Sequence, residues 1–465
     1  MNATDHRGVG RKGFLLVCLG QSFSQLGTAL SAFAIAVWIY QDTGSVTRLA
    51  MFYLAGALPA VIVLPWAGKW VDRFDRRSII LLSDGLAGGL SGVLVVLFWQ
   101  DWIRLWQLLV IVALATVLSR IQFLAFSASI SSLVRRERLA KANGMVQTGQ
   151  SIALLVAPLI AGVLMVRVGV VGVLVADVAS MSLAVLVWLL IRIPRPSGAL
   201  PEEEAEKSGL DELLFGFRYI RRHSGLIVLL ALFAAANLAG GMVQTLFTPL
   251  VLGFASERVL GTVVSVASLG VLAGGLAMSL WGGPRRRVAG IALLLVAQGC
   301  ALVFGGIWPH AVPVAVAGFL FMACGPMVAS LSSTIWQSKV PAAIQGKVFS
   351  VRSLLATSSA PVAFALAGPL ADRVFEPLLA PGGALVESVG SIVGVGKGRG
   401  IGLQFVALGL MVLVAVALAW RSRHLRCLEE DMPDALQGGE IQVEPPRRPA
   451  IPATAEPESL EGSAT

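Results

Sequence analysis

Charged residues are scarce in this sequence, and their scarcity defines the class of protein. Only 14% of the 465 residues are charged, whereas 56% are hydrophobic, and the mean hydropathy is +0.79. Soluble globular domains carry about 25% charged residues, so this composition excludes that class. The chain is therefore expected to be a polytopic membrane protein.

Cysteine and histidine are also rare, with four of each. The cysteines are scattered along the chain, and the histidines cluster neither with one another nor with cysteine. We therefore expect no disulfide framework, no metal site and no cofactor. A membrane enzyme would need clustered His, Asp or Cys, so this pattern also argues against an enzyme.

A nucleotide-binding loop is missing as well. The Lys-containing, Gly-rich stretch from Gly394 to Gly400 has Gly398 where a P-loop requires Ser or Thr, and Ser391 where it requires the first Gly. This excludes an ATPase. No signal peptide is expected, because the first apolar run is too long for its hydrophobic region and lacks a small-residue cleavage site.

What the sequence has instead is a series of long apolar runs. A membrane-spanning helix needs about 20 mostly apolar residues. Twelve runs meet this condition: 13–40, 49–68, 78–99, 104–130, 144–166, 169–191, 225–253, 258–282, 288–308, 311–334, 349–371 and 400–420. They lack period-2 alternation, which excludes a membrane β-barrel. The sequence predicts an all-α membrane protein with twelve transmembrane helices in two six-helix halves.

The distribution of Lys and Arg predicts the orientation. With the N-terminus inside, most of the 36 Lys and Arg fall on the cytoplasmic side. The outer loops hold only Arg48, Arg104, Arg167, Arg258, Arg373, Lys397 and Arg399. Both termini are therefore expected in the cytoplasm, with the protein in the cell inner (plasma) membrane. The net charge of +9 then reflects topology and contact with anionic membrane lipid, not nucleic-acid binding.

Five regions are predicted along the chain. They are a cytoplasmic N-terminus (1–12), an N-terminal six-helix half (13–191), a cytoplasmic linker (192–224), a C-terminal six-helix half (225–421) and a cytoplasmic tail (422–465). The linker ends in GLDELLFGFRYIRRH, whose apolar residues recur at helical spacing and predict an amphipathic helix on the membrane. The tail is acidic and Pro-rich, with almost no aromatics, and is expected to be disordered.

An internal repeat supports the division into two halves. Asn143-Gly144 opens the fifth run, which continues to Pro158, and Gln345-Gly346 opens the eleventh, which continues to Pro361. The two runs are six apart. Such a relation is typical of transporters built from parallel repeats.

A charge-dense loop carries the most specific motif. Between the second and third runs lies GKWVDRFDRR, which places a Gly four residues before an Asp-Arg pair and then a basic pair. The residues are Gly68, Asp72, Arg73, Asp75, Arg76 and Arg77. This loop resembles the signature loop of the major facilitator superfamily, although Trp70 and Asp75 replace the usual Leu and Gly. The resemblance implies a charge cluster that gates the cytoplasmic side. The alternative is ordinary positive-inside charge.

Within that superfamily the chain resembles the drug:proton antiporter branch, which contains macrolide-efflux and siderophore-exporting proteins. The resemblance covers most of residues 13–425 and rests on Asp84, on Asp177 followed by Ser180, and on the FGFRY segment of the linker. The fifth run also resembles the antiporter motif of this branch. Its residues are Gly149, Ala157, Pro158, Ala161 and Gly162, with Ala157 and Ala161 where Gly is commoner. Small residues around a Pro let helices pack closely and bend.

Arg120 is the most costly residue in the predicted spans. It lies 16 residues after Arg104 and 15 before Arg135, so roughly 22–24 Å of helix separates it from either flank. A charge at such depth costs about 2.5–3.5 kcal/mol unless it is paired or hydrated. Its place resembles a membrane-embedded Arg implicated in proton coupling, with Asp84 and Asp177 as possible partners. A static structural ion pair is the alternative.

Two polar stripes are predicted to face the substrate. Gln21, Gln25 and Thr28 share one face of the first span, and Asn237, Gln244 and Thr248 share one face of the seventh. Polar residues can also simply bond between helices.

The sequence thus predicts a monomeric secondary transporter that exports amphipathic organic molecules in exchange for protons. A facilitator or importer of a lysolipid or peptide-like metabolite on the same fold remains the alternative.

Overall fold

Long α-helices make up nearly all of this computed structural model, which describes residues 11–134, 139–190, 209–341, 344–396 and 398–432. Within these ranges, eleven helices are long and apolar enough to cross a membrane. Helices form because a backbone in lipid has no water partners and must satisfy its N–H and C=O groups internally. The predicted all-helical membrane fold is confirmed.

The first four spans follow one another through short turns. They are α1 (Arg11–Thr43), α2 (Val46–Arg73), α3 (Arg76–Trp99) and α4 (Leu105–Leu133). Two of the turns end in side-chain caps, since Ser45 accepts a hydrogen bond from the backbone N–H of Arg48, and Asp75 Oδ2 accepts one from Ser78 N at 3.0 Å. Ser and Asp favour this position because their oxygens satisfy N–H groups that the first turn leaves unpaired.

Helix α5 (Leu139–Leu190) has 52 residues and contains two spans. At 1.5 Å per residue it would be about 78 Å long, more than twice the roughly 30 Å hydrocarbon core of a bilayer. The break is at Gly169, whose φ of 65° and ψ of −173° are non-helical. Positive φ is readily adopted only by glycine. Counted as two, α5 brings the spans to the predicted twelve.

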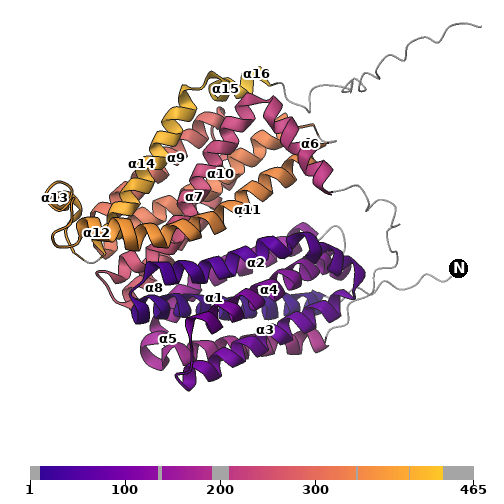
Figure 1. Ribbon diagram of the computed structural model, residues 1–465. Helices are drawn as coiled ribbons and strands as arrows, with labels where there is room; N and C mark the ends of the chain where they lie inside the picture. Colours follow the sequence, from indigo (N-terminus) through magenta and orange to yellow (C-terminus); the bar gives the residue numbers. More distant parts are fainter. Residues whose placement is uncertain (1–10, 135–138, 191–208, 342–343, 397, 433–465) are drawn as a thin grey trace, which may run out of the picture.

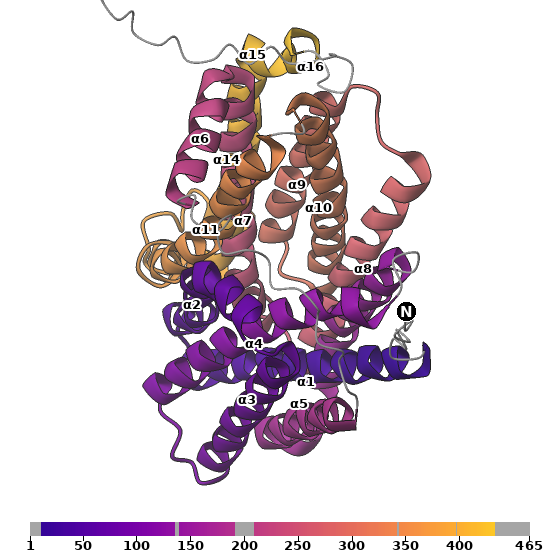
Figure 2. The same ribbon diagram turned by 90° about the vertical axis from the view of Figure 1, so that its right-hand side faces the viewer.

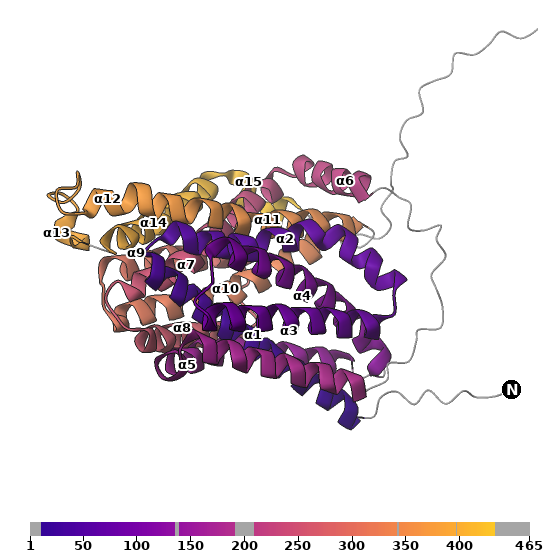
Figure 3. The same cartoon turned by 60° about the horizontal axis from the view of Figure 1, so that its bottom comes forward.

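The second half repeats this arrangement. Its spans are α7 (Ser224–Leu252), α8 (Glu257–Trp281), α9 (Arg287–Ile307), α10 (Ala311–Lys339), α11 (Gln345–Leu370) and α14 (Arg399–Arg421). Between α11 and α14 the chain forms a π-helix (Ala371–Phe375) and two one-turn helices, α12 (Glu376–Leu379) and α13 (Gly390–Val393). Figure 3 shows α12 and α13 at the opposite end of the bundle from α6.

The predicted linker contains helix α6 (Gly209–Arg222). Its Leu214 and Phe217 are exposed, whereas Ile220 is buried. Gly216 lies against the backbone carbonyl of Lys347, so α6 packs on the first turn of α11. The acidic part of the linker, residues 192–208, lies outside the described residues.

The start of the tail differs from the prediction of disorder. Two short helices, α15 (Arg423–Arg426) and α16 (Leu428–Asp431), follow α14. They are ordered because Leu425 and Leu428 are buried and because Lys339 Nζ donates hydrogen bonds to two backbone carbonyls near α16. Residues 433–465, where the tail prediction also applies, lie outside the described part of the chain. The same is true of most of the predicted N-terminus.

Figure 1 shows the two halves converging at the end that carries α8 and α12 and diverging toward the end that carries α6, and Figure 2 shows the N-terminal half below the C-terminal half. We name the end that carries Arg11 and Met432 the inner end, and the opposite one the outer end. The largest buried cluster contains residues of both halves, such as Leu49, Leu250 and Ala367, which lie toward the outer end. Toward the inner end each half has its own cluster. The inner part of α2 exposes Trp66, Trp70 and Phe74, which fits a bundle open on that side.

Candidate functional site

A chain of buried polar groups connects three helices of the N-terminal half. Gln122 of α4 donates from Nε2 to Gln21 Oε1 of α1 at 2.9 Å and to Asp84 Oδ2 of α3 at 3.5 Å. All three side chains are at most 9% exposed. Polar groups at this depth are costly unless hydrogen-bonded, so these bonds fix the relative positions of α1, α3 and α4.

A second buried carboxylate, Asp177, lies in the latter part of α5. It is 2% exposed, and its Oδ2 accepts a hydrogen bond from Ser91 of α3 at 3.1 Å. Its Oδ1 is buried without a hydrogen-bond partner among the described residues, and so is the Ser31 hydroxyl of α1. Gly27 of α1 is packed so closely here that a Cβ atom would lie 2.9 Å from Asp177 Oδ1. The hydroxyls of Ser31 and Thr28 lie near enough to interact with this carboxylate, but among the described residues Ser91 makes the hydrogen bond to it that has normal geometry.

Arg120 is exposed and is not joined to either acid. Among the described side chains, no hydrogen bond or ion pair connects it with Asp84 or Asp177. The static ion pair considered from the sequence is therefore not what this conformation contains. The two acids are held by Gln122 and Ser91 instead, and a role of Arg120 in proton coupling stays a prediction.

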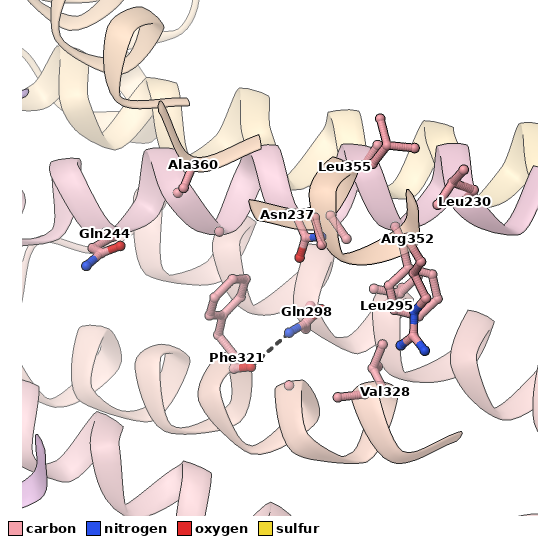
Figure 4. A pocket seen from close by; sticks show the side chains of 18 of the residues that line it. Leu230, Asn237, Gln244, Leu295, Gln298, Phe321, Val328, Arg352, Leu355 and Ala360 are labelled. Atoms are coloured by element: carbon pink, nitrogen blue, oxygen red, sulfur yellow. Dashed lines mark hydrogen bonds between the residues drawn. The ribbon is translucent and has the colours of Figure 1, made fainter. Parts of the chain in front are cut away.

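A cavity of about 450 Å³ lies in the C-terminal half, between α7, α9, α10 and α11 (Figure 4). Asn237 and Gln244, two of the residues predicted to face the substrate, line it. Arg352, Gln298 and Trp336 add polar or aromatic groups to walls that are otherwise apolar. The volume is within the range of about 300–1,000 Å³ typical of small-molecule sites.

The other residues of the predicted stripes lie elsewhere. Gln21 belongs to the buried polar chain, and Thr248 is buried outside the cavity lining. Gln25 is partly buried, while Thr28 is exposed and donates its hydroxyl to the Ser24 carbonyl at 3.1 Å. Helical spacing places the residues of each stripe on one face of their helix. That face contacts other helices at some residues and is exposed or lines the cavity at others.

In the charge-dense loop, the contacts described for the basic pair are hydrogen bonds to backbone carbonyls. Arg76 donates to the Ala128 carbonyl of α4 at 2.8 Å, and Arg77 donates to the Trp188 and Leu189 carbonyls at the end of α5. Carbonyls in the last turn of a helix lack intrahelical partners, which makes them good acceptors. Asp75 caps α3, and Arg73 is exposed. The surroundings of Gly68 and the side chain of Asp72 lie outside what the structure describes.

The small residues of the predicted antiporter motif pack α5 against both halves. Ala157 and Ala161 are buried with α1 residues such as Leu30 and Ala34. Gly162 faces α8, where a Cβ atom would lie 2.9 Å from the Glu257 carbonyl. Gly149 packs on Ser22 of α1, and the Pro158 carbonyl lies against Gly261 of α8. The motif therefore lies at a contact between the halves.

Sequence reasoning missed the contact that joins the halves at the outer end. Asp372, in the π-helix after α11, accepts hydrogen bonds from Ser45 Oγ at 2.8 Å, Val46 N at 3.1 Å and Thr47 N at 2.8 Å. It therefore caps the N-terminus of α2 from the other half, where a carboxylate is favoured by the unpaired N–H groups. Beside it, Gly368 of α11 lies directly on the Thr47 backbone. We call these residues the outer seal.

Other site residues were missed for lack of a periodic signal. Gln122 lies two residues after Arg120, and Ser91 belongs to an apolar run, so neither forms a stripe. Arg352 lies only three residues inside the predicted span 349–371. An arginine near the end of a span usually extends to the membrane interface, so its position in the sequence did not indicate that it lines a cavity.

Potential metal ligands do not cluster in the part of the chain that the structure describes. Within the described residues, no group of three or more His, Cys, Asp or Glu could hold a metal ion. The buried groups are single carboxylates, amides and hydroxyls, and these can bind a proton or a polar part of an organic solute.

These features define an α-helical membrane transporter: twelve spans in two halves, contacts that join the halves at one end, and a cavity within the bundle. The chain belongs to the Major Facilitator Superfamily, whose model matches residues 17–365. It is accordingly a multi-pass membrane protein and a transporter rather than an enzyme.

Known relatives and structures agree with this family. The chain is 24% identical to macrolide efflux protein A of Streptococcus pyogenes, over 78% of this chain and 90% of that protein. It is 23% identical to the multidrug efflux pump Tap of Mycolicibacterium fortuitum, over the same shares. A bacterial homologue of the human lysosomal transporter Spinster, in an inward-facing and unoccupied conformation, matches with a TM-score of 0.67 at 15% identity, covering 91% of this chain and 99% of that one.

Proposed function

We propose that this protein is a secondary active transporter that exports amphipathic organic molecules in exchange for protons by alternating access. The observation that carries the proposal is the buried carboxylate of Asp177, one oxygen of which has no hydrogen-bond partner among the described residues. An ionised acid in that position is costly, and a proton removes its charge. Asp84, which accepts a long hydrogen bond from Gln122, offers a second proton site in the same half.

The proposed direction of transport rests on the relatives, and the proposed class of substrate rests on the chemistry of the cavity. Two relatives are named as efflux proteins for macrolides or for multiple drugs. A cavity with apolar walls, amides and one arginine suits a bulky organic solute with few polar groups. The relatives favour export over import, and the cavity favours an amphipathic molecule over a small polar one.

Alternating access requires that the outer end and the inner end are not open at the same time. In the conformation described here the outer seal is formed, and the two halves diverge toward the inner end. The complementary state would break the contacts of Asp372 and close the inner end, where the loop from Gly68 to Arg77 would act as the gate. The protein would work as a monomer in the cell inner (plasma) membrane, with both termini cytoplasmic and protons and membrane lipid as its partners.

Accumulation assays in an efflux-deficient bacterial host test this proposal. Cells that express the protein should accumulate less of at least one compound from a panel of drugs and siderophores than cells without it. Collapse of the proton gradient by a protonophore should abolish the difference. Greater accumulation would favour an importer, and export that ignores the protonophore would favour a facilitator.

A further inference from the structure

Arg352 places a positive charge on the wall of the cavity in the C-terminal half. It lies in the second turn of α11, and its side chain is partly buried. Its guanidinium carbon lies 5.8 Å from the ring centroid of Trp336, which is itself buried in α10. Figure 4 shows the guanidinium pointing away from Leu355, toward Val328 and Leu295.

Among the residues that the structure describes, no carboxylate balances this charge. No Asp or Glu is among the residues that line the cavity, and no hydrogen bond or ion pair of Arg352 is present among the described residues. The aromatic ring is its one described partner. Cations within a span normally pair with an acid or face water in a cavity. Arg352 is therefore a charge that the surrounding protein leaves available.

Contact with an aromatic ring leaves hydrogen-bond donors of the guanidinium free. A guanidinium carries five N–H groups, and the Trp336 ring, 5.8 Å from its central carbon, does not pair with them as a carboxylate would. The free edge matches the two oxygens of a carboxylate, which can accept two parallel hydrogen bonds. Trp336 also limits the orientations of the side chain, so less conformational entropy is lost when an anion binds.

The rest of the cavity defines the body of the ligand. Leu230, Phe233, Leu295, Val328 and Leu355 provide apolar surface around the guanidinium. Asn237 and Gln244 lie farther along α7, as Figure 4 shows, and can bond a second polar group. Gln298 is less available, because its Nε2 donates to the Phe321 carbonyl at 3.0 Å.

We propose that this cavity is a binding subsite for an amphipathic organic anion, with Arg352 as the residue that binds its carboxylate. The inference rests on the proposed transport function, because it narrows the substrate class to acids with an aromatic or aliphatic body. It concerns binding alone and requires neither proton coupling nor a direction of transport.

Isothermal titration calorimetry on the full-length protein in nanodiscs tests the proposal with 2-naphthoate and 2-naphthamide as probes. The two share a ring system and differ in a carboxylate against a neutral amide. The wild type should bind 2-naphthoate roughly tenfold more tightly, since a hydrogen bond to a charged group contributes about 1.5–3 kcal/mol. Arg352→Gln should abolish the preference, and Arg352→Lys should keep part of it.

Arg421→Gln is the matched control, because it removes one positive charge from the same half at an exposed position outside the cavity. It should retain the full preference. The proposal is overturned if the wild type does not bind the acid more tightly than the amide, including the case in which neither binds. It is also overturned if folded Arg352→Gln keeps the preference. The wild-type comparison decides the matter even if the variant does not fold, and a failure leaves the transport proposal standing.

Discussion

At the scale of single residues, the tightest packing beside a proposed proton site is at Gly27. A Cβ atom there would overlap the Ser180 hydroxyl and lie 2.9 Å from Asp177 Oδ1. Only hydrogen fits between α1 and the latter part of α5. The packing around Asp177 therefore depends on Gly27, although Gly27 has no side chain that could bind a proton or a substrate.

Replacement of Gly27 by Ala should destabilise the protein by about 1–3 kcal/mol, because overpacking of a well-packed site forces its neighbours to move. Gly89→Ala is the matched control, since Gly89 lies within a helix and a Cβ atom added there would have no neighbouring atom within 4 Å. It should be neutral or stabilising by up to about 1 kcal/mol. Thermal unfolding of both purified variants measures the difference. Equal stability of the two variants would contradict the packing described around Asp177.

The sequence indicated some of these residues and not others. Asp84 and Asp177 could be found because acids are rare in apolar runs. Their partners could not, since hydrogen bonds from Gln122 and Ser91 depend on how three helices rotate against one another. Arg120 shows the opposite case. Its depth in the sequence predicted that it is either paired with a carboxylate or hydrated in a cavity, and in the structure it is exposed and apart from both acids.

At the scale of elements, the outer seal joins a π-helix of one half to the first turn of α2 in the other. A carboxylate that accepts three hydrogen bonds at a helix N-terminus stabilises this end in the closed state. Gly368 adds to it, because its lack of a side chain allows α11 to contact the Thr47 backbone.

Asp372→Asn and Gly368→Ala should both shift the protein toward an outward-open state. An amide has one acceptor oxygen in place of two, and loss of a cap costs about 0.5–2 kcal/mol, which changes the ratio of the two states by roughly 2- to 30-fold. Spin labels at positions 42 and 258, on α1 and α8 at the outer end, would report the change as a longer distance in pulsed electron resonance. Gly346→Ala is the control, since Gly346 is on the same helix with open space around it. Unchanged distances in both test variants would contradict the role of the seal.

Most elements could be predicted from hydrophobic runs, and the exceptions have physical causes. The two spans within α5 were predicted as the runs 144–166 and 169–191, with Arg167 in the loop between them, and the helix breaks close by at Gly169. The π-helix and α12 could not be predicted, since residues 371–379 contain two acids and an arginine that are typical of a loop. The contact with α2 and the packing of Leu379 keep that segment helical.

At the scale of the whole molecule, the orientation in the membrane is a prediction from the Lys and Arg distribution. A single Cys at position 101 should react with an impermeant reagent added outside the cell, whereas Cys at positions 76 and 286 should react only after lysis. The four native cysteines would first be replaced. Labelling of position 286 from outside would contradict the predicted orientation and the predicted number of spans between the N-terminus and this position.

The arrangement of the halves could not be predicted from the sequence beyond its division in two. The repeat from Asn143 and from Gln345 indicated two related halves, and the family resemblance indicated their fold. The closed outer end depends on contacts between residues more than 300 positions apart, such as Asp372 with Val46. No local pattern carries that information.

The most direct test of the account measures proton movement and substrate efflux together. Proteoliposomes would contain the purified protein, a pH-sensitive dye and a substrate identified by the accumulation assay. The account predicts that an imposed pH gradient drives efflux of the substrate with proton movement in the opposite direction, and that Asp177→Asn abolishes this dependence while substrate exchange without a gradient continues. Efflux by the wild type that ignores the gradient, or full gradient-driven efflux by Asp177→Asn and Asp84→Asn, would contradict it.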